Sequence, residues 1–227
     1  MPWRSLTLIF LGIVLLAACS PQQSQAGTET FIMPDDRPTK IVMLGDSLTA
    51  GYGLRRRDAL PNVVERHLTE AGWDATLINS GISGDTTGGA LARYAESVSD
   101  HQPDVLVILL GTNDFLSGIS AARARQNLER IISRAQGNDI HVVLVGIRPR
   151  FTEVPQAIQD EYTGMFESLA ADRNLSFHPD LMEGVWHNAD LMMIDGLHPT
   201  ADGVEVMGER LSDMLKTILR NTPAADD

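Results

Sequence analysis

Short apolar runs alternate with longer stretches of helical period from residue 40 onward. Two of the runs, 105–110 and 142–145, are continuously apolar, which is typical of strands covered on both faces in a parallel sheet. The other expected strands lie at 41–44, 75–79 and 175–177. Strands that alternate with helices predict an α/β fold: a three-layer α/β/α sandwich of flavodoxin type around a mostly parallel, five-stranded sheet.

Apolar side chains between these runs recur at the spacing of a helix face, so they predict helices that cover the sheet. The first stripe ends before Gly72 and the second before Gly137, and glycine commonly follows the end of a helix. We expect all four stripes to face the hydrophobic core rather than a cofactor. They consist of Val63, Val64, His67, Leu68 and Ala71; Leu128, Ile131, Ile132 and Ala135; Ile158, Tyr162, Met165, Phe166 and Leu169; and Val204, Met207, Leu211, Met214, Leu215 and Ile218.

The N-terminal segment has the pattern of a secretory signal. A basic residue at Arg4, an apolar stretch from Leu6 to Leu16 and small residues before Cys19 predict a signal peptide over 1–18. The apolar stretch is too short to cross a bilayer comfortably. The sequence from Leu16 to Cys19 resembles the lipobox of bacterial lipoproteins, which implies a diacylated Cys19 that anchors the chain to a membrane.

The segment after the signal predicts a connection rather than a folded element. Residues 19–39 are rich in Gln, Ser, Thr and Pro and have no apolar period, which is typical of a flexible tether. One folded domain is expected over 40–220 and a disordered tail over 221–227. Ser20 stands where an inner-membrane retention signal would usually place Asp, so the resemblance favours a periplasm-facing lipoprotein of the outer membrane. The alternative is a soluble periplasmic protein.

Composition narrows the set of partners. The chain has 227 residues and a formal net charge of −12. The one basic run, residues 55–57, is followed at once by Asp58 and is expected to be a solvated loop. With no other cluster of Lys and Arg to displace counterions from a phosphate backbone, we expect no nucleic-acid partner. Cys19 is the only cysteine, which rules out an intrachain disulfide and a cysteine-based metal site. No His-Glu-x-x-His or comparable spacing occurs, so no metal is expected either.

A serine follows the first expected strand directly. Residues 45–53 are rich in glycine and place Ser47 at the carboxyl end of that strand, before a helix, where sites lie in sheets of this kind. A serine at this position is often only a helix N-cap. The G-x-S-x-G elbow of α/β-hydrolases is not matched, because Thr49 stands where its second glycine should be.

A serine nucleophile needs a base, and the base needs an acid that orients it. Asp195 and His198 supply both on one tight turn, with Gly196 permitting the bend and Pro199 keeping His198 out of the final helix. The remaining histidines lack an equally placed acid, and we expect them to be structural or solvated. These are His67, His101 and His141, with His178 and His187 in loops.

Two further segments offer donors for a tetrahedral oxyanion. Residues 79–86 follow the second strand and include Gly81, whose backbone N–H has no side chain in its way. Residues 111–114 follow the third strand and include Asn113, whose amide can point back toward Ser47. Either segment alone is often an ordinary turn, but both join Ser47 at the ends of consecutive strands.

These four segments, together with the chain from about 40 to 219, resemble the SGNH (GDSL-type) hydrolases. Within that family they resemble the bacterial periplasmic enzymes with thioesterase, protease and lysophospholipase activities, and the related arylesterases. The resemblance implies Ser47 as nucleophile, Asp195 and His198 as the other triad members, and Gly81 and Asn113 as oxyanion donors beside the Ser47 N–H. It implies no cofactor. Thr112 replaces a glycine of the multifunctional enzymes, so their substrate preference does not transfer.

Other acids and apolar residues near these segments are expected to order loops or to line a substrate pocket. Asp46, Asp85 and Asp114 are expected to order their loops by hydrogen bonds rather than to catalyse. Four residues are candidates for an apolar wall that suits an acyl chain, with ordinary core positions as the alternative. They are Phe115, Leu116, Ile147 and Phe151.

The sequence therefore predicts a serine esterase that hydrolyses carboxylic esters or thioesters, possible substrates including lysophospholipids, through a Ser-His-Asp acyl-enzyme. Two alternatives remain open at this point. One is an envelope glycan acyl or acetyl esterase or transferase, which would use the same triad with a sugar hydroxyl in place of water. The other is a non-catalytic envelope lipoprotein that retains the fold and binds lipid or glycan.

Overall fold

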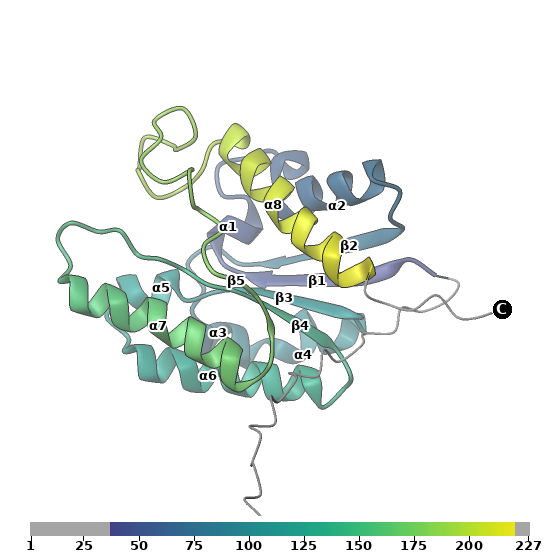
Figure 1. The fold of residues 1–227 in the computed structure, drawn as a ribbon, viewed down its shortest axis with the longest axis horizontal. Helices are drawn as coiled ribbons and strands as arrows, with labels where there is room; N and C mark the ends of the chain where they lie inside the picture. Colours follow the sequence, from purple (N-terminus) through teal and green to yellow (C-terminus); the bar gives the residue numbers. More distant parts are fainter. Residues whose placement is uncertain (1–36, 221–227) are drawn as a thin grey trace, which may run out of the picture.

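The computed structural model describes residues 37–220 and shows an α/β/α sandwich. Five parallel strands form one sheet in the order β2-β1-β3-β4-β5 (Figure 1). The predicted fold class is confirmed, since this strand order is that of flavodoxin-like sheets. The strands are β1 (Thr39–Gly45), β2 (Ala75–Gly81), β3 (Val105–Leu109), β4 (His141–Val145) and β5 (Ser176–His178).

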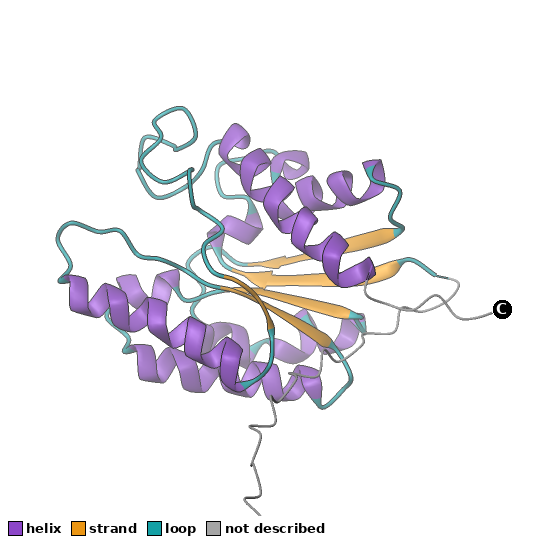
Figure 2. Ribbon diagram, viewed as in Figure 1, coloured by secondary structure: helices purple, strands orange, loops and turns teal. Residues whose placement is uncertain are grey.

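Helices cover both faces of the sheet (Figure 2). Alternate side chains of β1 point to opposite faces: Val42 and Leu44 join one buried cluster, and Ile41 and Met43 join the other. The helices that complete the first cluster are α3 (Thr87–Ala92), α4 (Tyr94–Ser97), α6 (Ala121–Gln136) and α7 (Gln156–Asp172). The second cluster is completed by α2 (Leu60–Glu70) and α8 (Ala201–Arg220). Short helical turns are α1 (Ser47–Ala50), η1 (Arg56–Asp58), η2 (Ser99–His101) and α5 (Thr112–Leu116).

The predicted helix ends are close to those observed. Helix α2 is followed by Gly72 in the left-handed region at φ 84°, and α6 has Gly137 as its C-cap. In the third stripe one residue was wrong: Ile158 is 45% exposed at the start of α7. Gln159 takes the inward position instead, because its amide binds the backbone of Phe151 and Val154 in the preceding loop.

Two smaller expectations also need correction. His178 was expected in a loop but is the last residue of β5 and is half-buried. Ala71 was expected on the core face of α2 but is exposed, because it lies just past the last turn of that helix as its C-cap.

The parallel sheet brings the chemistry-bearing segments to one edge. Gly45 at the end of β1 is in register with Gly81 at the end of β2 and with Leu109 at the end of β3. The segments after these three strands therefore start side by side. A side chain on Gly45 would meet Thr49 Oγ1 at 2.0 Å, so this glycine lets α1 pack directly on the strand end.

The predicted signal peptide, the lipidated Cys19, the tether as far as residue 36 and the tail over 221–227 lie outside the described residues. Within 37–220, no helix combines the length and the apolar character that crossing a bilayer requires.

Candidate active site

Ser47 is the first residue of α1, immediately after β1. Asp46 caps this one-turn helix, with its carboxylate accepting a hydrogen bond from the Leu48 N–H at 3.1 Å. The helix ends at Gly51, which has a φ of 80°. The N–H groups of Gly51 and Tyr52 both donate to the Ser47 carbonyl at 3.1 Å. The turn thus fixes the Ser47 backbone and leaves its side chain at the carboxyl edge of the sheet.

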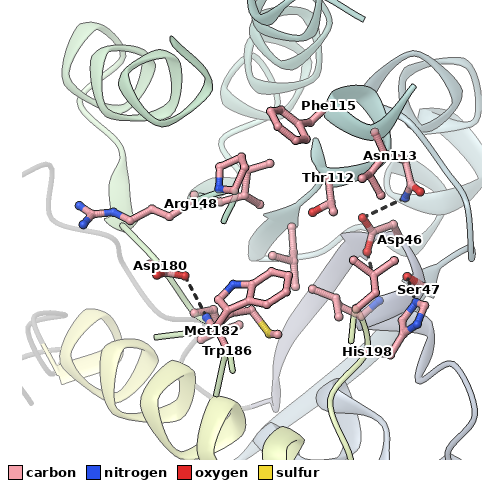
Figure 3. A pocket seen from close by; sticks show the side chains of 18 of the residues that line it. Asp46, Ser47, Thr112, Asn113, Phe115, Arg148, Asp180, Met182, Trp186 and His198 are labelled. Carbon is pink, nitrogen blue, oxygen red and sulfur yellow. Dashed lines mark hydrogen bonds between the residues drawn. The ribbon is translucent and has the colours of Figure 1, made fainter. Parts of the chain in front are cut away.

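A continuous hydrogen-bonded chain joins the three residues of the expected triad. His198 Nε2 lies 2.9 Å from Ser47 Oγ, and His198 Nδ1 lies 2.8 Å from Asp195 Oδ2. Figure 3 shows the imidazole beside Ser47. With the carboxylate accepting at Nδ1, the other ring nitrogen is the acceptor for the serine O–H. The geometry is therefore that of a nucleophile, a base and an orienting acid.

Asp195 is fixed by its own turn. Its Oδ1 accepts the backbone N–H groups of His198 at 3.0 Å and Leu197 at 2.9 Å. The His198 backbone bond, the bond to the His198 ring and the Leu197 backbone bond hold the pKa of Asp195 at about 2. The carboxylate is therefore ionised at any working pH, although its side chain is 39% exposed.

An isolated antiparallel bridge holds the segment that carries His198. Met192 pairs with Pro199, and the Met193 N–H donates to the His198 carbonyl at 2.8 Å. Gly196 has a φ of 66° and allows the chain to turn between Asp195 and His198. The imidazole therefore projects from an extended segment before α8, as the sequence predicted.

Asn113 lies in α5, directly after β3, and its amide reaches the serine turn. Its Nδ2 donates to Asp46 Oδ2 at 3.2 Å, and Figure 3 shows this contact. Because the amide nitrogen carries two N–H groups, one remains for a ligand. Asp46 is buried, and its desolvation raises the pKa to about 6, against the opposing effects of the Leu48 hydrogen bond and of His198.

The Gly81 N–H already has a hydrogen-bond acceptor, whereas the sequence analysis expected it to be available to an oxyanion. This N–H donates to Asn79 Oδ1 at 3.0 Å, so it is engaged within its own strand. A side chain on Gly81 would meet the Ala50 nitrogen at 2.3 Å, so the glycine serves the close packing of β2 on α1. Three residues on, Gly84 has a φ of 82° and open space above it. No hydrogen-bond acceptor is found for its N–H among residues 37–220.

The neighbouring acids order the loops, as expected. Asp114 accepts the Thr87 N–H at 2.8 Å and the Thr87 hydroxyl at 2.6 Å, joining α5 to the start of α3. Asp85 pairs with Arg93 at 2.8 Å, and Arg93 also donates to the Gly45 carbonyl at 3.2 Å. The loop after β2 is therefore tied to the end of β1, directly below Ser47.

Comparison with known proteins decides the family. Residues 43–206 match the GDSL-like lipase/acylhydrolase family. The chain belongs to this family. An arylesterase of Vibrio mimicus is 36% identical over 180 residues, covering 78% of this chain and 88% of that one. Thioesterase 1/protease 1/lysophospholipase L1 of Escherichia coli K12 is 26% identical over 183 residues, covering 80% and 85%.

A solved structure supports the same assignment. AlinE4, an esterase of the SGNH-hydrolase family, has a TM-score of 0.67 and 35% sequence identity, with 83% of this chain and 98% of that one covered. The predicted resemblance is thus confirmed. The enzyme class is that of serine hydrolases acting on ester bonds.

An apolar pocket of this GDSL-type hydrolase opens beside Ser47 and His198 (Figure 3). All four predicted wall residues line it, although Phe115 is also buried in the core. The sequence analysis missed the opposite wall, formed by Leu181, Met182 and Trp186. No sequence signal marked these residues, because they lie in an irregular loop without a hydrophobic period.

The remaining surroundings of His198 include one more residue that the sequence analysis did not single out. The ring of Tyr52 packs on the imidazole with centroids 4.3 Å apart and a tilt of 31°. Other histidines have structural contacts: His67 pairs with Glu205 at 2.8 Å, and His141 contacts Ser176 at 3.0 Å. Among residues 37–220, no group of three or more metal-binding side chains was found.

Proposed function

We propose that this hydrolase cleaves carboxylic esters or thioesters by acyl transfer to Ser47. The observation that carries the proposal is the unbroken chain of hydrogen bonds from Ser47 Oγ through His198 to Asp195. The apolar pocket beside the serine supports an acyl group as the part of the substrate that the enzyme holds. The arylesterase and thioesterase/lysophospholipase relatives support the same substrate class.

The reaction has two steps. His198 Nε2 takes the Ser47 proton as Oγ forms a bond to the acyl carbon, and the bond from that carbon to the leaving oxygen or sulfur then breaks. The imidazolium returns the proton to the leaving group. Water, activated by the same nitrogen, then hydrolyses the acyl-enzyme, releasing the acid and restoring Ser47. Asp195 keeps the imidazole oriented and stabilises its charged form.

Three donors are proposed for the oxyanion. The Ser47 N–H is the first of α1 and has no acceptor within residues 37–220. The second N–H of Asn113 is directed by the contact that the first makes with Asp46. From the loop after β2 we assign Gly84 in place of Gly81, because the Gly81 N–H is bonded to Asn79. Each such donor is worth about 3–4 kcal/mol in the transition state.

Replacing the nucleophile tests the proposal. Ser47→Ala should abolish hydrolysis of p-nitrophenyl acetate and labelling by a fluorophosphonate probe, with the circular dichroism spectrum unchanged. Ser117→Ala is the matched control, since Ser117 is an exposed serine at the end of α5 that does not line the pocket. Turnover by folded Ser47→Ala would overturn the mechanism, and an unlabelled wild-type protein would favour the non-catalytic alternative.

We further propose that the enzyme is exported and held at a membrane facing the periplasm. The signal pattern over 1–18 and the lipobox-like sequence ending at Cys19 support this placement. A lipid anchor would keep Ser47 within reach of membrane-derived esters.

A further inference from the structure

The pocket beside Ser47 leaves little free space for a ligand. The whole concavity, including the part open to solvent, measures about 630 Å³, whereas the space able to hold groups of water size is about 40 Å³. A single water needs roughly 10–15 Å³ of such space, so the interior holds about three groups of that size. An acyl chain that enters the pocket thus meets a wall after a few carbon atoms.

Trp186 supplies that wall. Its indole is half-buried and stands in the pocket near Asp180 and Met182, across from Phe115 (Figure 3). The Trp186 ring packs edge-on against Phe151 with centroids 6.0 Å apart. Phe151 in turn stacks on Phe115 at 5.5 Å. Phe151, which is backed by Phe115, therefore blocks movement of the indole in that direction.

The loop that carries Trp186 is also fixed. Asp180 is buried, and its carboxylate pairs with Arg150 at 2.6 Å while accepting the Met182 N–H at 3.1 Å. The backbone N–H of Trp186 donates to the Met182 carbonyl at 3.0 Å. Leu181 and Val185 are buried in the core beneath. These contacts hold the backbone of Trp186 at a set distance from Ser47.

We infer that Trp186 closes the acyl pocket and makes this enzyme selective for short acyl groups, of about two to four carbon atoms. The inference rests on the proposed function, since it concerns the acyl group transferred to Ser47. Longer chains must remain in the open mouth, where their apolar surface stays in water and contributes no binding energy to the transition state. Trp186 is thus a specificity-determining residue of the site.

The test is a chain-length series with a constant leaving group. The values of kcat/KM are measured for p-nitrophenyl acetate, butyrate, octanoate and decanoate on the purified enzyme and its variants. The wild type should prefer acetate or butyrate over octanoate by at least tenfold. Trp186→Ala should raise the octanoate-to-acetate ratio at least tenfold, the factor that about one buried methylene is worth in a hydrophobic pocket. Trp186→Phe should give an intermediate ratio.

Trp73→Ala is the matched control, because Trp73 is also half-buried and packs against the same core cluster but does not line the pocket. Its octanoate-to-acetate ratio should equal that of the wild type. A wild type that prefers octanoate overturns the inference even if Trp186→Ala fails to fold, and so does an unchanged ratio in folded Trp186→Ala. If no ester is hydrolysed by the wild type at all, the proposed function fails instead.

Discussion

At the scale of single residues, the buried carboxylate of Asp46 affects both the stability of the protein and its active site. Its carboxylate is buried beside Ser47, where desolvation raises its pKa to about 6 from an ordinary value of 3.8. The folded protein therefore binds this proton more tightly than the unfolded chain does. Between about pH 4 and pH 6 the free energy of unfolding should fall as pH rises, by up to about 3 kcal/mol from this group. The same carboxylate accepts a hydrogen bond from the Asn113 amide, which we propose as an oxyanion donor.

Asp46→Asn should separate the effect of this carboxylate on stability from its effect on catalysis. The neutral side chain avoids the cost of a buried charge, so at pH 8 the variant should be more stable than the wild type by about 1–2 kcal/mol. The kcat should drop at least tenfold, because Asn113 loses the carboxylate that directs its amide. Urea unfolding at pH 5 and pH 8 with kcat at pH 8 measures both effects. A variant less stable than the wild type at pH 8 would contradict the assignment.

Tyr52 packs against His198, which becomes positively charged when it takes the Ser47 proton. The centroid of its ring lies 4.3 Å from that of the imidazole, so we expect it to stabilise the imidazolium as a cation–π partner. Tyr52→Leu keeps an apolar cover but lacks this interaction, and kcat should fall about two- to fivefold. Tyr52→Phe is the control and should match the wild type; equal losses in both variants would point to the hydroxyl instead.

At the scale of elements, the approach of β2 to α1 sets the position of the nucleophile. Gly81→Ala places a side-chain carbon 2.3 Å from the Ala50 backbone, so α1 must move. We expect a loss of about 1–3 kcal/mol in the free energy of unfolding and a lower kcat. Gly84→Ala is the comparison: it suffers the left-handed φ of 82° but meets nothing within 4 Å. Its cost should be about 1 kcal/mol, with kcat within about threefold because the N–H is kept.

Gly81 and Gly84 show which part of the site could not be predicted from the sequence. Hydrophobic periods predicted the strands, the helices and the parallel sheet, because each depends on local pattern and burial. Ser47, Asp195 and His198 emerged from their places at strand ends and on a turn. Residues 79–86 contain two glycines, and pattern alone does not tell which one packs on α1 and which one has a free N–H. That distinction depends on contacts between β2 and the helix after β1.

The walls of the pocket were predictable only in part for a related reason. Phe115 and Leu116 directly follow a strand that the pattern revealed, so their place at the carboxyl edge could be inferred. Trp186 lies in an irregular loop between β5 and α8, and its distance from Ser47 is set by the Asp180–Arg150 pair and by packing on Phe151. Neither contact can be inferred from the spacing of residues in the sequence.

At the scale of the whole molecule, the two ends of β1 would place the proposed anchor and the active site at opposite edges of the sheet. The described chain enters the sheet just before Thr39, and Ser47 follows the opposite end of the same strand. Seven extended residues span about 23 Å. A segment of tether length, 20–36, can reach at most about 60 Å, enough to pass along the domain from the amino edge to the level of the pocket. Anchoring at Cys19 is therefore compatible with an active site that faces the membrane.

Cys19→Ser tests this arrangement in a bacterial host that processes lipoproteins. The wild type should incorporate labelled palmitate and sediment with membranes, while the variant should carry no label, because no second cysteine exists to accept it. Ser20→Ala is the control and should be labelled like the wild type. Specific activity on a soluble ester should be the same for purified wild type and variant, since the anchor joins the domain at the edge away from Ser47. Label retained by Cys19→Ser would refute the anchor, and a loss of soluble-ester activity would refute the separation of the two ends.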